Sequence, residues 1–282
     1  MTENQTIEKP GITKLKAPNK YHVIMLNDDT TPMDFVISIL VQVFNKDVET
    51  AKEIMIEIHN KGRGVAGAYS FEVAEQKCVE TTTISRKNNY PLEVTMKIAI
   101  TQRVIDYRNG PYDSLDHGFY SMFKGHELLP IPNNLKFLRT QTITEADLVV
   151  FSGGNSMVSD NWQYNYDRLV VEKHVLDLAM AYEKKILGIS RGTQFLTVSF
   201  GGTIKPDPNH KKNHYVNSTG ARVEVCSRHE EVLGSIPAGA EVLAKDDDGN
   251  TEAWKLKNIG CVLWHPERMN NHWMPNPLNW HK

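Results

Sequence analysis

Residues 186–202 read ILGISRGTQFLTVSFGG, in which a short apolar run leads directly into a glycine-flanked serine and then into a helical pattern. Leu148–Phe151 is a second apolar run, followed by Gly153 and Gly154, and a long amphipathic pattern covers residues 166–182. Strand, tight turn and helix in repetition are typical of a doubly wound, mostly parallel sheet. We therefore predict an α/β domain whose sites lie at the carboxyl ends of its strands.

Upstream of this domain the sequence predicts a smaller α+β unit in the order strand, helix, helix, strand, helix, strand. The strand at 21–26 is followed by a turn at 27–30, and the later elements are helices at 33–44, from 48 to Gly62 or Gly64 and at 70–83, with a half-buried strand at 92–96. Thr31 is placed to cap the first helix, with Pro32 in its first turn.

A new apolar strand begins at Lys97 without a Pro/Gly/Ser-rich linker, so the two domains are expected to touch. The predicted division is a disordered polar tail at 1–18, a small domain at 19–96 and an α/β domain at 97–282. A length of 282 residues agrees with about two domains.

Composition excludes several classes of partner. The formal net charge of -2 provides no basic field for nucleic acid, and no apolar run approaches a membrane span. Three cysteines, Cys78, Cys226 and Cys261, form no CxxC pair, and the polar start has no apolar export signal. We therefore expect a cytoplasmic protein with no nucleic-acid partner, no membrane partner and no disulfide framework.

No cofactor or metal motif is evident. There is no phosphate-binding glycine loop for ATP, and His210 and His214 flank two lysines without a metal-ligand spacing. We expect a loop at these histidines. Cys226 and Cys261 lie on predicted strands, where buried thiols are usually inert.

The chemistry of the α/β domain centres on Ser190. The GxSxG motif at 188–192 follows a strand and precedes a helix, the context in which a sharp turn exposes the serine hydroxyl beside helix N–H groups. Far downstream, His265 and Glu267 stand two residues apart, so the carboxylate could orient the imidazole as a general base on extended backbone. A serine that only packs the turn is the alternative.

These motifs resemble class I glutamine amidotransferases and their γ-glutamyl hydrolase relatives from about residue 97 to 269. The resemblance rests on KIAITQRV, Leu115-Asp116, SGGN, GISRGTQ, FGGT, SRH and WHPE. It implies a flavodoxin-like α/β fold and a triad of Ser190, His265 and Glu267. It also implies an oxyanion hole from Gly154 and the backbone of Arg191, and a small amide substrate such as glutamine or a γ-glutamyl compound.

The family has cysteine where this chain has Ser190. Serine must lose its proton during the attack, which demands closer geometry between nucleophile and base than a preformed thiolate does. Three hypotheses remain open: an inactive domain that still binds an amide, a true Ser-His-Glu hydrolase, and a serine with a packing role alone.

The small domain carries polar residues at a strand end, at Asn27 and Asp28, and His59 near a helix end. Turn chemistry and core packing account for such residues without any ligand. However, YHVIMLNDDTTPMDFVISIL at 21–40, HNKGRGVAG at 59–67 and SFEVAEQKC at 70–78 closely resemble the ClpS adaptor family. That resemblance covers about residues 19–97.

The ClpS resemblance implies an adaptor that recognises a bulky apolar N-terminal residue and hands the protein to the ClpA unfoldase of ClpAP. By position, Asn27, Asp28 and His59 would bind the free α-amine, since amide, carboxylate and imidazole acceptors suit an ammonium. The side-chain pocket would be lined by Met33, Met55, Ile58 and Leu92. Glu72 and Lys77 would dock on ClpA, although a solvated helix face also explains them.

The sequence as a whole therefore predicts an adaptor fused to an amide-handling domain of reduced or altered activity. The alternative makes amide or γ-glutamyl hydrolysis the main function, with the adaptor as a targeting module.

Overall fold

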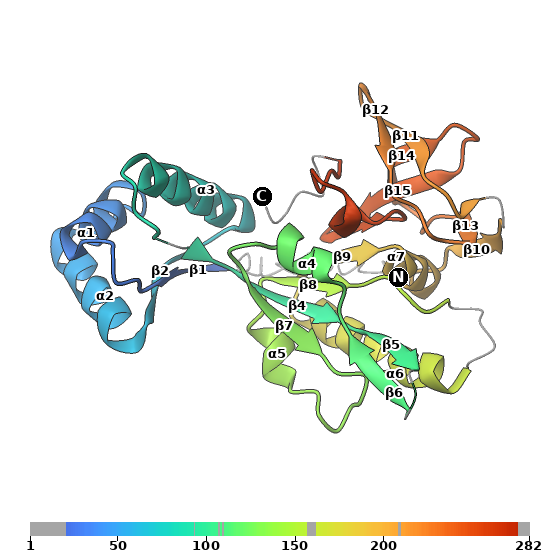
Figure 1. Cartoon of the computed structure of the whole chain (residues 1–282), viewed down its shortest axis with the longest axis horizontal. Helices are drawn as coiled ribbons and strands as arrows, with labels where there is room; N and C mark the ends of the chain where they lie inside the picture. The colour runs from blue at the N-terminus through green and yellow to red at the C-terminus, as the bar shows by residue number, and fades with distance from the viewer. Residues whose placement is uncertain are drawn as a thin grey trace, which may run out of the picture.

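The structure is a computed structural model that describes residues 21–92, 94–106, 108, 110–156, 162–207 and 210–275, without the side chains of 71, 72, 75 and 162–164. The tail predicted at 1–18 lies outside the described residues. Figure 1 shows a small N-terminal α+β domain beside a larger domain built on one long sheet.

The small domain has the predicted order of elements. They are β1 (Tyr21–Leu26), α1 (Met33–Gln42), α2 (Val48–Lys61), β2 (Arg63–Tyr69), α3 (Phe71–Lys87) and β3 (Val94–Thr95). The sheet order is β2-β1-β3 with antiparallel pairs, and β3 is shorter than the predicted strand because only Val94 and Thr95 pair with β1.

Local signals explain both ends of α2. The Asp47 carboxylate accepts the Thr50 N–H at 2.9 Å, and this hydrogen bond lowers the pKa of Asp47. Gly62 ends the helix with a φ of 75°, the left-handed conformation that glycine adopts most readily.

The cap predicted for α1 is wrong by one residue. Pro32 is the N-cap, the Thr31 hydroxyl has no hydrogen-bond partner among the described residues, and the backbone N–H of Thr31 donates to the Asp28 carboxylate.

The larger domain begins with β4 (Lys97–Thr101) and the hairpin β5 (Arg103–Asp106) and β6 (Pro111–Ser114). The elements of its parallel region then follow in the chain: α4 (His117–Met122), β7 (Glu127–Ile131), α5 (Thr140–Thr144), β8 (Leu148–Phe151), α6 (Trp162–Ala181), β9 (Lys185–Ile189) and α7 (Arg191–Ser199). The rest is mostly strands: β10 (Thr203–Pro206), β11 (His214–Ser218), β12 (Ala221–Val225), β13 (Glu231–Ser235), β14 (Glu241–Asp246), β15 (Thr251–Leu256) and β16 (Ile259–Val262), before the 3-10 turn η2 (Pro266–Arg268).

The main sheet has the order β12-β11-β14-β15-β16-β9-β8-β4-β7. The five strands from β16 to β7 are parallel, as predicted, whereas β15, β14, β11 and β12 extend the sheet in antiparallel fashion. No pattern in the sequence predicts this extension. It matters for function because it brings distant histidines together, as described below.

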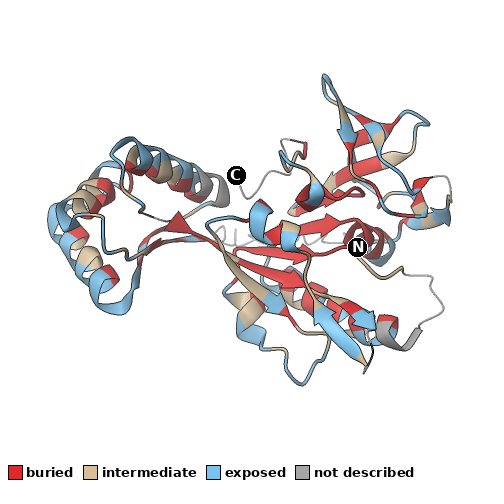
Figure 2. Cartoon of the chain, in the orientation of Figure 1, coloured by how far each residue is buried: buried red, intermediate tan, exposed pale blue. Residues whose placement is uncertain are grey.

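Alternate residues of the parallel strands supply two cores, one on each face of the sheet. Ile98, Leu148 and Leu187 belong to a core with α4, which continues into the small domain, and Ala99, Val149 and Ile186 belong to a core with α5, α6 and α7. Figure 2 shows the buried central strands between these layers. Strands buried on both faces explain the continuous apolar runs of the sequence.

The two domains touch, as the short junction predicts. Met96 alone separates β3 from β4 and is 2% exposed, and its carbonyl accepts the Glu127 N–H at 2.9 Å. The Glu127 carboxylate also lies 3.5 Å from the Arg63 guanidinium of β2.

Within the described residues, none of the helices has the length and apolar character needed to traverse a bilayer.

Candidate functional site

Ser190 lies at the sharp turn between β9 and α7. Its backbone has φ 53° and ψ -114°, a strained conformation for a residue that is not glycine, and its N–H donates to the Val262 carbonyl at 2.9 Å. The side chain is 5% exposed. This is the geometry of a nucleophile elbow, which the GxSxG motif predicts.

The two glycines of the motif are required by close packing. A Cβ atom on Gly192 would lie 1.9 Å from the Phe151 carbonyl oxygen, and one on Gly188 would lie 2.9 Å from the Cys261 sulfur. Neighbouring strands therefore hold the elbow on both sides.

Gly192→Ala is expected to destabilise the chain by about 1–3 kcal/mol, because the new methyl group meets a backbone carbonyl that cannot move without distorting β8. Thermal unfolding measures the effect, with the exposed Ser199→Ala at the end of α7 as the control. Equal melting temperatures for the two variants would contradict the close approach.

His265 and Glu267 form a buried pair. His265 Nδ1 lies 2.7 Å from Glu267 Oε1, and the backbone N–H of His265 donates to the Cys226 carbonyl at 2.8 Å. The predicted extended backbone is wrong here: His265 is the N-cap of the 3-10 turn η2, and the turn brings the carboxylate back to the imidazole. With Nδ1 bonded to Glu267, Nε2 is the nitrogen left for a proton transfer.

Three strand ends bring the elbow and this pair together. A Cβ atom on Gly153, which follows β8, would lie 2.9 Å from His265 Cε1 and 3.3 Å from Ser190 Cβ. Ser190 and His265 line one pocket of about 220 Å³ together with Gly154 and Arg191, the residues predicted to supply the oxyanion hole. As the first residue of α7, Arg191 has a backbone N–H without a partner inside the helix.

A buried ionic network that the sequence analysis missed supports this loop. The Arg168 guanidinium donates to the carbonyls of Ser152 and Gly154 at 2.8 and 2.9 Å. It also bonds Glu172 at 2.9 Å, and the other oxygen of Glu172 accepts from Arg191. Burial lowers the pKa of Arg168 to about 10, while the two guanidinium groups overcome the burial of Glu172 and hold the pKa of that carboxyl below its ordinary value.

Glu172→Gln is expected to destabilise the protein by about 3–5 kcal/mol, because two buried guanidinium groups then lose the negative charge that they share. Chemical denaturation measures this, with Asp177→Asn on the exposed side of α6 as the matched control. A variant within about 0.5 kcal/mol of the parent chain would show that the network has no structural role.

A second pocket, of about 210 Å³, lies in the small domain at the end of β1. Six of the seven residues predicted to form a binding site there line this pocket: Asn27, Asp28, Met33, Met55, Ile58 and His59. The Asn27 N–H donates to the Gly62 carbonyl at 2.9 Å, which holds the loop after β1 against the end of α2. Asn27 and His59 are exposed, whereas Ile58 and Val36 are buried, so the pocket has a polar rim and an apolar floor.

Asp28 is oriented by its own loop. Its Oδ1 accepts the N–H groups of Thr30 and Thr31 at 2.9 and 2.6 Å. Its Oδ2 is buried and has no hydrogen-bond partner among the described residues. A buried carboxylate oxygen without a donor is costly, so this atom favours a donor from a ligand.

Comparison with known proteins divides the chain in the same way. Residues 16–95 match the family described as "ATP-dependent Clp protease adaptor protein ClpS", and residues 103–281 match "Glutamine amidotransferase class-I". An ATP-dependent Clp protease adapter protein ClpS of Xylella fastidiosa is 45% identical over 97 residues, 34% of this chain and 92% of that protein. The chain belongs to both families.

A second ClpS, from Xanthomonas oryzae pv. oryzae, is 51% identical over 86 residues, which are 30% of this chain and 81% of that protein. The amidotransferase part is similar to the solved structure of a glutamine amidotransferase from Thermotoga maritima, with a TM-score of 0.50, 16% identity and coverage of 61% of this chain and 76% of that one. At this identity the likeness concerns the fold.

Three other residues predicted in the ClpS domain have different surroundings. Leu92 does not line the pocket at Asp28: it is 4% exposed and lines a separate hollow with Cys78 and Val94, because it precedes β3 on the α3 side of the sheet. The Lys77 ammonium contacts the Val43 carbonyl and lies 5.0 Å from the Tyr69 ring. The side chain of Glu72 is outside what the structure describes.

The amidotransferase domain also contains a largely buried histidine cluster that no motif of the sequence predicts. His210, His214 and His229 surround Glu252, which is fully buried. Burial lowers the pKa of His229 to about 4. The loop predicted at His210 and His214 is wrong for His214, which is the first residue of β11. No local pattern predicts the cluster, because His229 and Glu252 reach these two histidines through the antiparallel strands.

The cysteines do not replace Ser190. Cys261 lies on β16, where burial raises the pKa of its thiol, and Cys226 follows β12 instead of lying on a strand as predicted.

Proposed function

We propose that the ClpS domain binds proteins through a free N-terminus whose first residue is bulky and apolar, and delivers them to a ClpA-type unfoldase. The observation that carries this proposal is the unpartnered Oδ2 of Asp28 at a pocket with an apolar floor.

An α-ammonium group suits this polar rim. It has three N–H donors and a positive charge, and Asp28, Asn27 and His59 offer a carboxylate, an amide oxygen and an imidazole nitrogen. An acetylated N-terminus has one N–H and no charge, so it cannot satisfy the carboxylate.

The apolar floor suits the first side chain. Met33 and Met55 are unbranched and adaptable, so the same walls can contact Leu, Phe, Tyr or Trp, while Ile58 and Val36 close the bottom. We assign no contact to Leu92. Delivery to the unfoldase rests on the name that the ClpS relatives carry, and docking through Glu72 and Lys77 stays a prediction.

Fluorescence anisotropy of labelled peptides tests the binding. Peptides that begin with Leu, Phe or Tyr are expected to bind, and the same peptides beginning with Gly or Asp are expected to bind at least about tenfold more weakly, since a bulky side chain fully buried contributes about 1.5–3 kcal/mol. Equal affinities for the two sets of peptides would contradict recognition of the first side chain by this pocket.

We further propose that the amidotransferase domain hydrolyses a small amide such as glutamine or a γ-glutamyl compound through Ser190. The hydrogen bond of His265 to Glu267 at 2.7 Å, next to a strained elbow, favours a working base. The pocket carries Lys211, Arg228 and Glu230, which suit a small, charged substrate.

In this mechanism Ser190 Oγ attacks the amide carbonyl as its proton passes to His265 Nε2. The N–H groups of Gly154 and Arg191 stabilise the oxyanion. The C–N bond then breaks, ammonia leaves with the proton from His265, and water hydrolyses the Ser190 ester with His265 again as the base. Glu267 keeps the imidazole in the required tautomer.

A further inference from the structure

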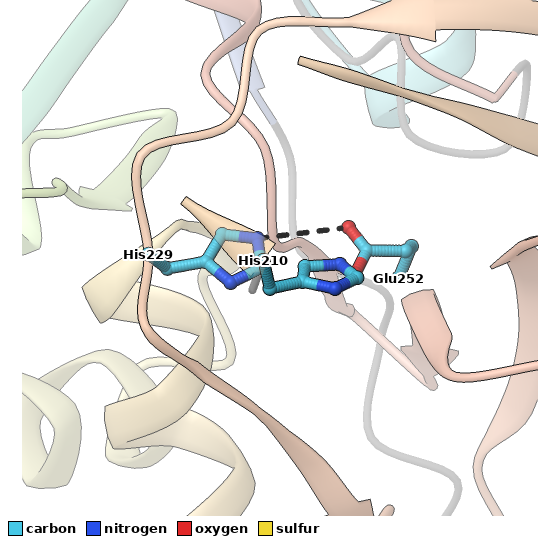
Figure 3. A group of neighbouring side chains, drawn as sticks. All are labelled: His210, His229 and Glu252. Carbon is cyan, nitrogen blue, oxygen red and sulfur yellow. Dashed lines mark hydrogen bonds and ion pairs between the residues drawn. The ribbon is translucent and has the colours of Figure 1, made fainter. Parts of the chain in front are cut away.

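Three histidines and a glutamate from distant parts of the amidotransferase domain converge beside the Ser190 pocket. His210 lies before β11, His214 begins β11, His229 lies in the loop before β13, and Glu252 is on β15. Figure 3 shows the side chains of His229, His210 and Glu252 side by side, with His210 in the middle. His210, His229 and Glu252 are all less than a tenth exposed.

The distances between donor atoms suit one small cation. His210 Nε2 lies 3.1 Å from Glu252 Oε1, and the Nε2 atoms of His214 and His229 lie 3.4 and 3.9 Å from Glu252 Oε2. Bonds of about 2.0–2.1 Å in a tetrahedral Zn²⁺ site place neighbouring donors roughly 3.4 Å apart. The donors of His210, His229 and Glu252 all fall within 4.8 Å of one another, and His214 Nε2 approaches this group at Glu252 Oε2.

The unpartnered atoms of the cluster are the ones a metal would use. Among the described residues, Nε2 of His214, Nε2 of His229 and Oε2 of Glu252 are buried without a well-formed hydrogen bond, although His214 Nε2 and Glu252 Oε2 lie within ion-pair distance of each other at 3.4 Å. Three such atoms at one point are difficult to explain in a fold that satisfies most of its buried polar groups. A cation that accepts their lone pairs would satisfy all three atoms.

The Nδ1 atoms of His229 and His214 are held by backbone carbonyl groups. His229 Nδ1 lies 3.0 Å from the Glu231 carbonyl, and His214 Nδ1 lies 3.1 Å from the Lys212 carbonyl. A carbonyl can only accept, so Nδ1 carries a hydrogen, and in the neutral ring Nε2 then presents its lone pair to the centre, which is the outer-shell arrangement of metal-bound histidines.

Charge also favours a cation. Glu252 and the neighbouring Asp246 are both buried carboxyl groups, and Asp246 Oδ2 lies 3.4 Å from His210 Nε2. Buried carboxyl groups need hydrogen bonds or positive charge nearby, and a divalent ion would supply the charge.

We propose that His210, His214, His229 and Glu252 bind one Zn²⁺ ion in a closed, tetrahedral, structural site. The ion joins the antiparallel strands β11 and β15 to the loop that carries Arg228 and Glu230. Because His229 also lines the Ser190 pocket, the metal fixes one wall of that pocket without touching the reacting atoms.

The test uses the full chain, stripped with a chelator and then titrated with Zn²⁺ against a chromophoric competitor. We expect one Zn²⁺ per chain, and Glu252→Gln and His229→Ala are expected to bind it at least about 10²-fold more weakly, a loss no smaller than outer-shell variants cause. His174→Ala, an exposed histidine on α6, is the matched control and keeps the parent affinity. A parent chain that binds no more tightly than His229→Ala would overturn the site.

Because the buried variants could unfold, His214→Ala provides a second arm, since this side chain is the most exposed of the four ligands at 16%. Zn²⁺ is expected to raise the melting temperature of the stripped parent chain but not that of His214→Ala. The same rise in both chains, or none in the parent, would contradict the proposal.

Discussion

Acetylation of the N-terminus of a peptide that begins with Phe is expected to weaken its binding to the ClpS domain by roughly 30-fold to 4,000-fold. Loss of the ammonium leaves the buried Oδ2 of Asp28 without its donor, and breaking a buried, hydrogen-bonded charge pair costs about 2–5 kcal/mol. The anisotropy of labelled peptides, free and acetylated, measures the ratio directly.

The matched variants for this prediction are Asp28→Asn and Asp29→Asn. Asparagine at 28 still offers Oδ1 to the N–H groups of Thr30 and Thr31, so the loop is retained while the charge is lost. Asp29 is exposed at the same pocket. We expect Asp28→Asn to reproduce most of the loss and Asp29→Asn to cause little. Equal binding of the free and acetylated peptides by the parent chain would contradict amine recognition.

Ser190→Cys is expected to raise the rate of glutamine or γ-glutamyl amide hydrolysis at least about tenfold, and Ser190→Ala to abolish it. A thiol beside His265 at a helix N-terminus ionises readily, whereas the serine hydroxyl needs the base during the attack itself. Ammonia release with glutamine and with γ-glutamyl amides measures both variants.

Two controls separate the outcomes of this series. Ser199→Ala, on the same helix, is expected to keep the parent rate, and His265→Ala in the Ser190→Cys background is expected to lose the gain. Hydrolysis that persists unchanged in Ser190→Ala would exclude Ser190 as the nucleophile. No hydrolysis by the parent chain or by Ser190→Cys would contradict the amide hydrolase proposal altogether.

The sequence predicted those parts of the two sites that local signals determine. The elbow at Ser190 depends on a strand, two glycines and a helix within a few residues, and the structure has all of them. The pocket at Asp28 follows from a turn after β1 and from two helix positions, Met55 and His59, one turn apart. In both sites, residues close together in the sequence determine where the functional side chains lie.

The site predictions fail where contacts between residues distant in the sequence determine the position of a side chain. Leu92 precedes a strand whose two paired residues only the tertiary structure reveals, so its side chain lies away from the pocket assigned to it. Glu172 lies under the elbow from a different helix, and no motif marks it. His210 and Glu252 meet across 42 residues because β11 and β15 flank β14 in the sheet, and no local pattern reports that order.

A crystal structure of the full chain with a peptide that begins with Phe tests the central claim most directly. We expect the α-ammonium nitrogen within hydrogen-bond distance of Asp28 Oδ2 and close to His59, with the Phe ring between Met33 and Met55 above Ile58. A peptide bound elsewhere, or an ammonium group that faces solvent while Asp28 Oδ2 keeps no partner, would contradict the proposed recognition.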